Sequence, residues 1–227
     1  RAALEADLLL NMPKLKTHAL AYMTLGVKNL FGLIPGLEKA RWHFRAQESA
    51  DFSVLLVDLY GALLQHRGDA PRLLHVLDGV LAMEGDGPGM SGIPRHAGLL
   101  LAGEDAVALD RVACRLVRLD GEQLLTSKLA AEQGLGEGDL AKIELAGDPP
   151  EQLEVADFRP PRGKLSFRTT WPLNSRLLRN RLVEHPVVAA DRCIACGHCA
   201  RICPPQAIHL RGPGRPVRID LDGCIRC

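Results

Sequence analysis

The sequence has no long hydrophobic run, no excess of charge of either sign and no signal-peptide pattern at its start. Apolar residues make up 47% of the 227 residues, yet no stretch approaches the roughly 18 uninterrupted apolar residues of a membrane-spanning helix. The formal net charge is +1, so nothing global favours nucleic acid or an anionic membrane surface. We therefore expect no membrane span and no nucleic-acid partner.

The chain also lacks an internal repeat before its cysteine-rich end. A length of 227 residues is enough for one α/β core and a small appendage. The chain begins with Arg1 in what looks like an ongoing element, and its last C-x-x-C step stops at Cys227. We therefore expect a fragment of a longer protein at both ends.

Cysteine is the most informative residue type in the chain. Six of the seven cysteines stand at C-x-x-C or C-x-x-x-C spacings, namely Cys193, Cys196, Cys199, Cys203, Cys224 and Cys227. Such spacings close badly as structural disulfides and suit a metal centre, which indicates a reducing compartment and favours the cytoplasm. The seventh, Cys114, lies in an amphipathic helical pattern, and we expect a small buried side chain there.

The order C-x-x-C-x-x-C-x-x-x-C-P is typical of 4Fe–4S clusters. In the bacterial two-cluster pattern the fourth cysteine of each run serves the other cluster. By this rule Cys193, Cys196 and Cys199 hold one cluster, whereas Cys203 joins Cys224 and Cys227 at a second. Each set is one ligand short, so two clusters are expected only in the complete protein. Zinc bound by four thiolates is the competing interpretation, but zinc sites usually pair two C-x-x-C knuckles.

Other residues of this segment complete the prediction. We expect His198 to be a surface residue, because cysteines already supply the ligands. Four isoleucines are expected to keep water from the cluster sulfides, namely Ile194, Ile202, Ile208 and Ile225. The stretches "AIHL" and "VRIDL", on either side of "RGPG", predict a hairpin.

The first 150 residues alternate apolar runs with helical patterns, which predicts an α/β fold with a mostly parallel sheet and covering helices. Asp51 is the expected N-cap of the first long helix, and Asp105 of the second. The predicted strands cover 6–13 (buried), 72–80, 96–103 and 141–147, and the predicted helices cover 51–65, 104–121 and 124–136.

Three regions follow from these patterns. Residues 1–150 form the α/β domain, 151–186 a basic, proline-containing linker, and 187–227 a small, incomplete C-terminal α+β ferredoxin-like segment. From Arg159 to Arg181 every charged residue is basic. This run is either a solvated linker or a docking strip for an acidic redox partner, because charge complementarity speeds encounter.

Three peculiar stretches carry a family resemblance: "NMPKLKTHALAYMTLGVKNLFGLIPG", "DGVLAMEGDGPGMSGIPRHAGLLLAGEDAVALD" and "GLGEGDLAKIELAG". With the cysteine run, they resemble the domain of unknown function 362 family of iron–sulfur cluster-binding proteins, over essentially the whole chain. The resemblance implies an α/β domain followed by a ferredoxin-like segment, and it implies no reaction. Ala106 departs from the proline expected after Asp105. A more distant similarity of fold to nickel-pincer lactate racemases transfers no chemistry.

Basic residues gather around one predicted strand end, where open α/β sheets bind ligands. Lys14, Lys16 and His18 follow the first strand, and "GVKN" adds Lys28 and Asn29. This set suits a carboxylate or a phosphate, although solvated surface lysines are the simpler interpretation. Lys14, Lys16 and His18 are also catalytic candidates.

A glycine-rich stretch after a later strand, "DGVLAMEGDGPGMSG", carries Asp78, Glu84 and Asp86. It fits neither the dinucleotide fingerprint nor the P-loop. Its amides, at Gly85 and Gly87, are candidates for binding an anion, and its carboxylates for a metal; tight turns are the alternative. Glu84 is the fourth catalytic candidate.

These observations favour an electron-transfer or oxidoreductase component with 4Fe–4S clusters, a redox partner protein and a small anionic ligand in the α/β domain. An electron carrier or scaffold without catalysis of its own is the second possibility. The third is a non-redox, isomerase-like metal-cofactor enzyme with structural clusters. The patterns leave open whether the chain is an enzyme.

Overall fold

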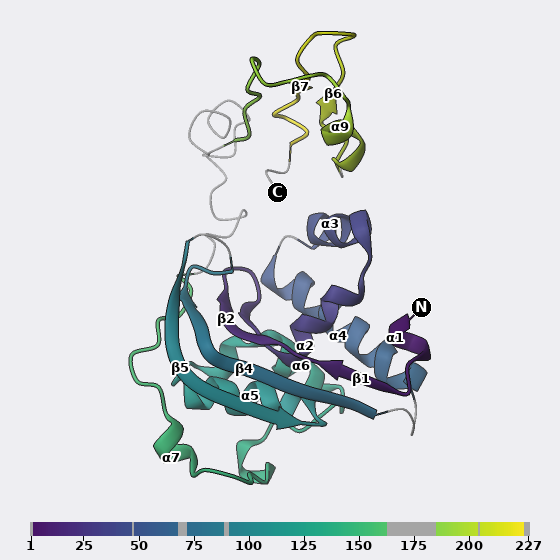
Figure 1. The fold of residues 1–227 in the computed structure, drawn as a ribbon. Helices are drawn as coiled ribbons and strands as arrows, with labels where there is room; N and C mark the ends of the chain where they lie inside the picture. The colour runs from purple at the N-terminus through teal and green to yellow at the C-terminus, as the bar shows by residue number, and fades with distance from the viewer. Residues whose placement is uncertain are drawn as a thin grey trace. The chain divides into compact units, whose positions relative to one another are not determined.

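The computed structural model describes residues 2–46, 48–67, 72–88, 91–162, 185–203 and 205–224. The chain divides into two compact units, Arg1–Leu33 with Ala46–Lys164, and Ile34–Arg45 with Leu165–Cys227. The first is an α/β unit, and the second contains the cysteine segment (Figure 1). The predicted linker lies largely outside the described residues, because 163–184 are not among them.

A mixed five-stranded sheet forms the framework of the α/β unit. Its central strand, β4, has β1 and then β2 along one edge, both parallel to it, and β5 antiparallel along the other. The short β3 pairs antiparallel with β2. The α/β class is therefore confirmed, with two antiparallel pairings added. The strands are β1 (Leu8–Asn11), β2 (Lys14–His18), β3 (Tyr22–Thr24), β4 (Arg72–Gly85) and β5 (Gly92–Gly103).

Strands β4 and β5 form one long hairpin where the sequence predicted two short strands. Gly79, near the end of the predicted strand 72–80, lies inside β4 beside an irregularity in the register. A Cβ atom at Gly79 would lie 3.0 Å from side-chain atoms of Leu15 and Leu99. This glycine therefore permits close packing across the sheet rather than ending the strand.

The helices of the unit pack on one face of the sheet (Figure 1). Leu73 and Leu77 point to the same face of β4; Leu73 packs in a cluster with α4, and Leu77 in a cluster with α5. The main helices are α2 (Gly26–Asn29), α4 (Ser49–Arg67), α5 (Ala106–Leu116) and α6 (Leu125–Glu132). Shorter ones are α1 (Ala2–Glu5), α7 (Pro150–Leu153), η1 (Leu30–Leu33), η2 (Gly121–Gln123) and η3 (Leu140–Lys142).

The other face of the sheet exposes apolar side chains. The exposed fractions include 52% for Leu8, 62% for Met12, 56% for Val80 and 68% for Leu100. The first strand was predicted to be buried, and this is wrong for its outward side chains. Among the described residues, helices cover only one face of the sheet. Because side chains alternate along a strand, every second side chain therefore points to the uncovered face.

Several local predictions succeed and others fail. Both later helices form, and Asp105 caps α5 by accepting hydrogen bonds from the amides of Val107 and Ala108 at 2.7 and 3.0 Å. Asp51, in contrast, lies in the first turn of α4 and not at its N-cap. The strand predicted over 141–147 is wrong: η3 and irregular chain occupy that stretch, which makes no strand pairing.

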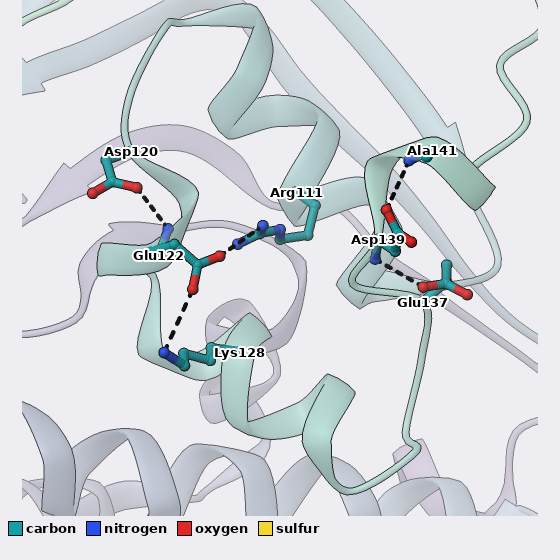
Figure 2. Close-up of polar contacts among 7 residues, drawn as sticks. All are labelled: Arg111, Asp120, Glu122, Lys128, Glu137, Asp139 and Ala141. Carbon is teal, nitrogen blue, oxygen red and sulfur yellow. Dashed lines mark hydrogen bonds and ion pairs between the residues drawn. The ribbon is translucent and has the colours of Figure 1, made fainter.

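Charged side chains brace the region between α5 and α6 (Figure 2). The Arg111 guanidinium lies 3.0 Å from one carboxylate oxygen of Glu122, and Lys128 Nζ lies 3.4 Å from the other. Asp120 caps η2 through the amide of Glu122, and Asp139 caps η3. The connections flanking α6 are thus held by side chains rather than by further strands.

The second unit contains α3 (Gly36–Arg45), α9 (His198–Ile202) and the two-residue strands β6 (Ile208–His209) and β7 (Arg218–Ile219). The predicted hairpin is confirmed, since Ile208 pairs with Ile219 and His209 with Arg218. Gly212 and Gly214, in the connection, have φ of 104° and 69°, values that glycine adopts without strain. Within the described ranges, every helix is too short or too polar to span a membrane.

Candidate metal centre and ligand-binding edge

The cysteine segment winds around the short helix α9. Gly197 precedes this helix with φ of 74°, a left-handed conformation that reverses the chain between Cys196 and Cys199. Cys199 lies within α9 and Cys203 follows directly after it. Two of the predicted ligands, Cys199 and Cys203, therefore lie within one short helix and at its C-cap.

The five described cysteines of this segment form no disulfide, and Cys196 is exposed. In the part of the chain that the structure describes, no three Cys, His, Asp or Glu side chains already converge as metal ligands. The donor set nevertheless fits a 4Fe–4S cluster by type and order, because thiolates at C-x-x-C-x-x-C spacing are its usual ligands. Metal binding commonly completes such small sites, so convergence of the thiols is expected to accompany loading.

One thiol already has a hydrogen-bond donor. The amide of Ala207, a residue only 3% exposed, donates to Cys203 Sγ at 3.3 Å. Hydrogen bonds to cluster sulfurs are among the factors that set the reduction potential. His198 is exposed, as predicted.

The predicted isoleucine shield is absent from the described geometry. Ile194 is 83% exposed and Ile202 is 51% exposed, whereas Ile208 is partly buried. Two-residue strands give too little apolar surface to cover these side chains. Ile225 and the ligand candidate Cys227 lie outside the described residues.

In the α/β unit, polar residues gather where the parallel strands β2 and β4 end side by side. This is the edge at which open α/β sheets bind ligands. The stretch "PKLKTH" was placed just beyond a strand, but Lys14–His18 is itself β2. Only His18 therefore stands at the strand's end.

His18 is packed into this edge. Its Nδ1 accepts hydrogen bonds from the amides of Leu20 and Ala21, both at 3.1 Å. Its ring stacks on Phe52, with centroids 6.4 Å apart. Lys28 Nζ lies 5.8 Å from the centroid of the same phenyl ring. The structure thus brings His18 and Lys28 to one aromatic side chain.

Lys14 and Lys16 point to the opposite, open face of the sheet, since Leu15 between them is fully buried. Lys14 Nζ lies 2.7 Å from Asp78 Oδ2, and this hydrogen bond lowers the pKa of Asp78. The two lysines thus face the open side of the sheet, whereas His18, at the strand's end, contacts Phe52 of α4. Asn29 bonds to Asn11 at 2.8 Å.

Both carboxylates at the end of β4 hold a returning segment, residues 158–162, which we call the strap. Glu84 is 3% exposed; it accepts the Arg159 amide at 3.2 Å and lies 3.4 Å from Arg159 Nε. Asp86 accepts the Arg162 amide at 2.9 Å. These acidic residues bind the chain itself, so their first role is structural.

The candidate anion-binding amides are also engaged. Gly85 N donates to Arg159 O and Gly87 N to Gly85 O, both at 2.9 Å. A Cβ at Gly87 would lie 2.6 Å from Thr17 O. The glycine-rich stretch therefore allows the strap and β2 to approach closely, and its alternative interpretation as tight turns fits better than anion binding.

A buried polar network, missed by the sequence analysis, joins β1, β4 and α2. Asn11 Nδ2 donates to Gly26 O at 2.9 Å and lies 2.8 Å from His75 Nδ1. Burial lowers the pKa of His75 to about 4, so its ring is neutral near pH 7. No local pattern marks these residues, because their partners are distant in sequence.

Asp110 is the second buried group of this region. It accepts the amides of Gly26 at 2.6 Å and Val27 at 3.2 Å, at the start of α2. Burial, opposed by these two hydrogen bonds, raises its pKa to about 8. Cys114 is fully buried as predicted, and burial raises its pKa to about 12.

An α/β unit followed by cysteines at this spacing defines an iron–sulfur cluster-binding protein. The profile of the family "Domain of unknown function (DUF362)" matches residues 1–115, and that of the "4Fe-4S binding domain" matches residues 186–209. The first match covers half of the chain, so the chain belongs to the DUF362 family, and the second adds a 4Fe–4S binding domain.

A curated relative matches a larger part of the chain, and its name states no activity. "Thylakoid-associated protein sll1697" of Synechocystis sp. is 41% identical over 163 residues, which are 71% of this chain and 48% of the relative. The chain thus spans about half the length of that protein. No solved structure matches the chain.

Proposed function

We propose that the protein is an electron-transfer or oxidoreductase component, in which the C-terminal segment holds 4Fe–4S clusters and the α/β unit binds a small anionic ligand. The observation that carries the proposal is the cysteine series, which coincides with the 4Fe-4S binding domain. A bound 4Fe–4S cluster supplies transfer of one electron at a time.

The chain's own residues have distinct roles in this proposal. Cys193, Cys196 and Cys199 ligate one cluster, and Cys203 joins Cys224 and Cys227 at another, by the two-cluster ligand rule. The Ala207 amide stabilises negative charge on Cys203 Sγ.

The proposal keeps the ligand of the α/β unit at the edge where β2 and β4 end. His18 and Lys28, which share Phe52, remain candidates for proton transfer and for binding there. Lys14 and Lys16 would bind an anion only on the open face. Glu84 is assigned to holding the strap rather than to acid–base chemistry, because Arg159 occupies both its oxygens.

A carrier or scaffold is the second candidate, and one observation favours it: the carboxylates and loop amides at the strand ends already bind the chain itself. A redox partner protein is part of either proposal. The basic run from Arg159 to Arg181 is a candidate docking strip, and the reducing conditions that thiol ligands need agree with a cytoplasmic location.

The test is iron and acid-labile sulfide analysis on the complete reading frame, purified without oxygen. Two clusters predict about eight irons and eight sulfides per chain, and one cluster about four of each. Cys199→Ser should lower both numbers, whereas Cys114→Ala, at a buried cysteine outside the segment, should not. About one or two zinc ions and no sulfide would overturn the proposal.

Enzyme and carrier can then be separated by electron transfer. Reduced protein is mixed with an artificial acceptor, and the rate is compared between the wild type and Lys28→Gln or His18→Gln. A carrier keeps its rate in both variants, because the α/β unit then has no part in the electron transfer.

A further inference from the structure

A cavity of about 280 Å³ lies within the α/β unit, beside the turn that follows β2. Four segments line it: the turn 19–22, the first turns of α4, the start of α6 and the strap. Apart from Arg162, which belongs to the basic run 159–181, its polar residues have no local sequence signal, because the segments are far apart along the chain.

The polar groups of the lining suit an anion. They include the hydroxyls of Ser49 and Ser53, the carboxamide of Gln123 and the guanidinium of Arg162. Ser49 and Ser53 are four residues apart and so share one face of α4. No described lining residue is acidic, and the N-terminal end of the 19-residue α4 adds positive potential.

The remaining lining is apolar. Leu20, Leu125 and Pro161 contribute to it. A volume near 280 Å³ lies at the lower end of the usual range for ligand pockets, about 300–1,000 Å³. An anionic group with a short hydrocarbon part fits this combination.

The walls are held in place before any ligand binds. Ser49 Oγ donates to Leu20 O at 2.5 Å, which ties α4 to the turn. The Arg111–Glu122–Lys128 contacts brace the segment that contributes Gln123 and Leu125 (Figure 2). Preorganisation of this kind lowers the entropy that binding must overcome.

Arg162 combines a fixed backbone with an adaptable side chain. Its amide is held by Asp86 at 2.9 Å, while its side chain is 91% exposed and its Nε lies 3.7 Å from Asp86. An exposed ion pair of this length is weak. A bound carboxylate can therefore compete for the guanidinium.

We propose that this cavity is the ligand site of the α/β unit and that it takes a small organic acid. Arg162 and Ser53 hold the carboxylate, Ser49 fixes the wall through its bond to Leu20 O, and the hydrocarbon part packs against Leu125 and Pro161. The inference rests on the proposed function, which gives this unit an anionic ligand, and it locates that ligand away from Lys14 and Lys16.

The test is calorimetric titration of the full-length chain, purified anaerobically, with propionate and with its uncharged isostere propionamide. Propionate should bind saturably, and propionamide about tenfold more weakly or not at all. Arg162→Gln should weaken propionate about tenfold, the usual size for losing a hydrogen bond to a charged group. Arg115→Gln, an arginine on α5 that pairs with Glu151 outside the cavity, is the matched control and should bind as the wild type does.

Other outcomes overturn the inference. These are no saturable binding, equal binding of propionate and propionamide, or tighter binding of inorganic phosphate than of propionate. Loss of binding in Lys14→Gln or Lys16→Gln but not in Arg162→Gln would keep the anionic ligand of the proposed function and reject this cavity. Ser53→Ala is a second variant for the same titration and should also weaken propionate binding. Circular dichroism confirms that this variant is folded. Iron and sulfide content, measured on the same samples, decides the cluster assignment independently.

Discussion

The α/β unit and the cysteine segment satisfy their polar groups in different ways. In the α/β unit, Glu84, Asp86 and Asp110 each accept main-chain amides from distant segments. In the cysteine segment, Cys196 and Ile194 are exposed and the strands are two residues long. The α/β unit is stabilised by contacts within its own chain. The cysteine segment has thiols that are suited to bind a 4Fe–4S cluster, which would stabilise it.

The largest expected effect is loss of the cluster. Removing iron with a chelator should abolish amide protection in the cysteine segment and leave the α/β unit folded, because binding free energy there is folding free energy. Hydrogen exchange measures both regions at once. The informative amide is that of Asp220, which bonds to Ala207 O at 2.7 Å. Equal protection with and without iron would show that the two regions do not differ in this way.

Gly26→Ala should cause a large loss of stability in the α/β unit. The added Cβ would lie 2.9 Å from Asp110 Oδ1 and 3.2 Å from Ala106 Cβ. Overpacking of this kind costs about 1–3 kcal/mol, to be measured by urea unfolding. Gly32→Ala is the control, since a Cβ there meets nothing within 4 Å, and it should change stability little.

The pH dependence of stability should change in Asp110→Asn. The folded-state pKa of Asp110 is about 8, above its unfolded value. The folded state therefore keeps a proton that the unfolded state releases, and stability falls as pH rises from about 4 to 8, at most about 1.4 kcal/mol per pH unit.

His75 acts in the opposite direction. Its folded-state pKa is about 4, below the ordinary histidine pKa of 6.5, so stability falls as the pH drops from 6.5 to about 4. In the wild type the two groups oppose each other between pH 4 and 6.5, and only Asp110 acts from 6.5 to 8. Urea unfolding of Asp110→Asn should show a flatter curve from pH 6.5 to 8; an unchanged slope there contradicts the assignment.

Glu84→Gln should weaken the attachment of the strap more than Asp86→Asn does. Glu84 has a side chain 4% exposed, against 38% for Asp86. Losing a charged hydrogen-bond acceptor at a buried position lowers the free energy of unfolding by about 1–3 kcal/mol. The loss is smaller at a position exposed to solvent. Limited tryptic proteolysis after Arg162 compares the two variants, and equal cleavage rates would show that burial does not set the strength of the strap.

Lys14→Gln should have the smallest effect on stability. Lys14 and Asp78 form an ion pair with both side chains 43% exposed, and such pairs contribute little. Urea midpoints of wild type and variant should coincide within error. A clear loss would indicate that something covers the open face in solution.

Sequence reasoning succeeded where structure depends on near neighbours. The cap at Asp105, helices α5 and α6, the hairpin around 211–214 and the burial of Cys114 all follow from local patterns. It failed at two places. The predicted strand 72–80 continues well past Gly79, and the apolar stretch 141–147 forms no strand. Packing against Leu15 and Leu99 decided the first.

The order of the cysteines, the α/β class and the cluster chemistry were determined by the sequence itself, because ligand spacing and helix periodicity are local properties. The tertiary structure alone decided that Glu84 and Asp86 hold a strap 75 and 76 residues further along, that one sheet face stays open among the described residues, and that four segments line one cavity. These features depend on contacts between distant segments, which are determined by the complete packing of the chain and leave no local pattern in its sequence.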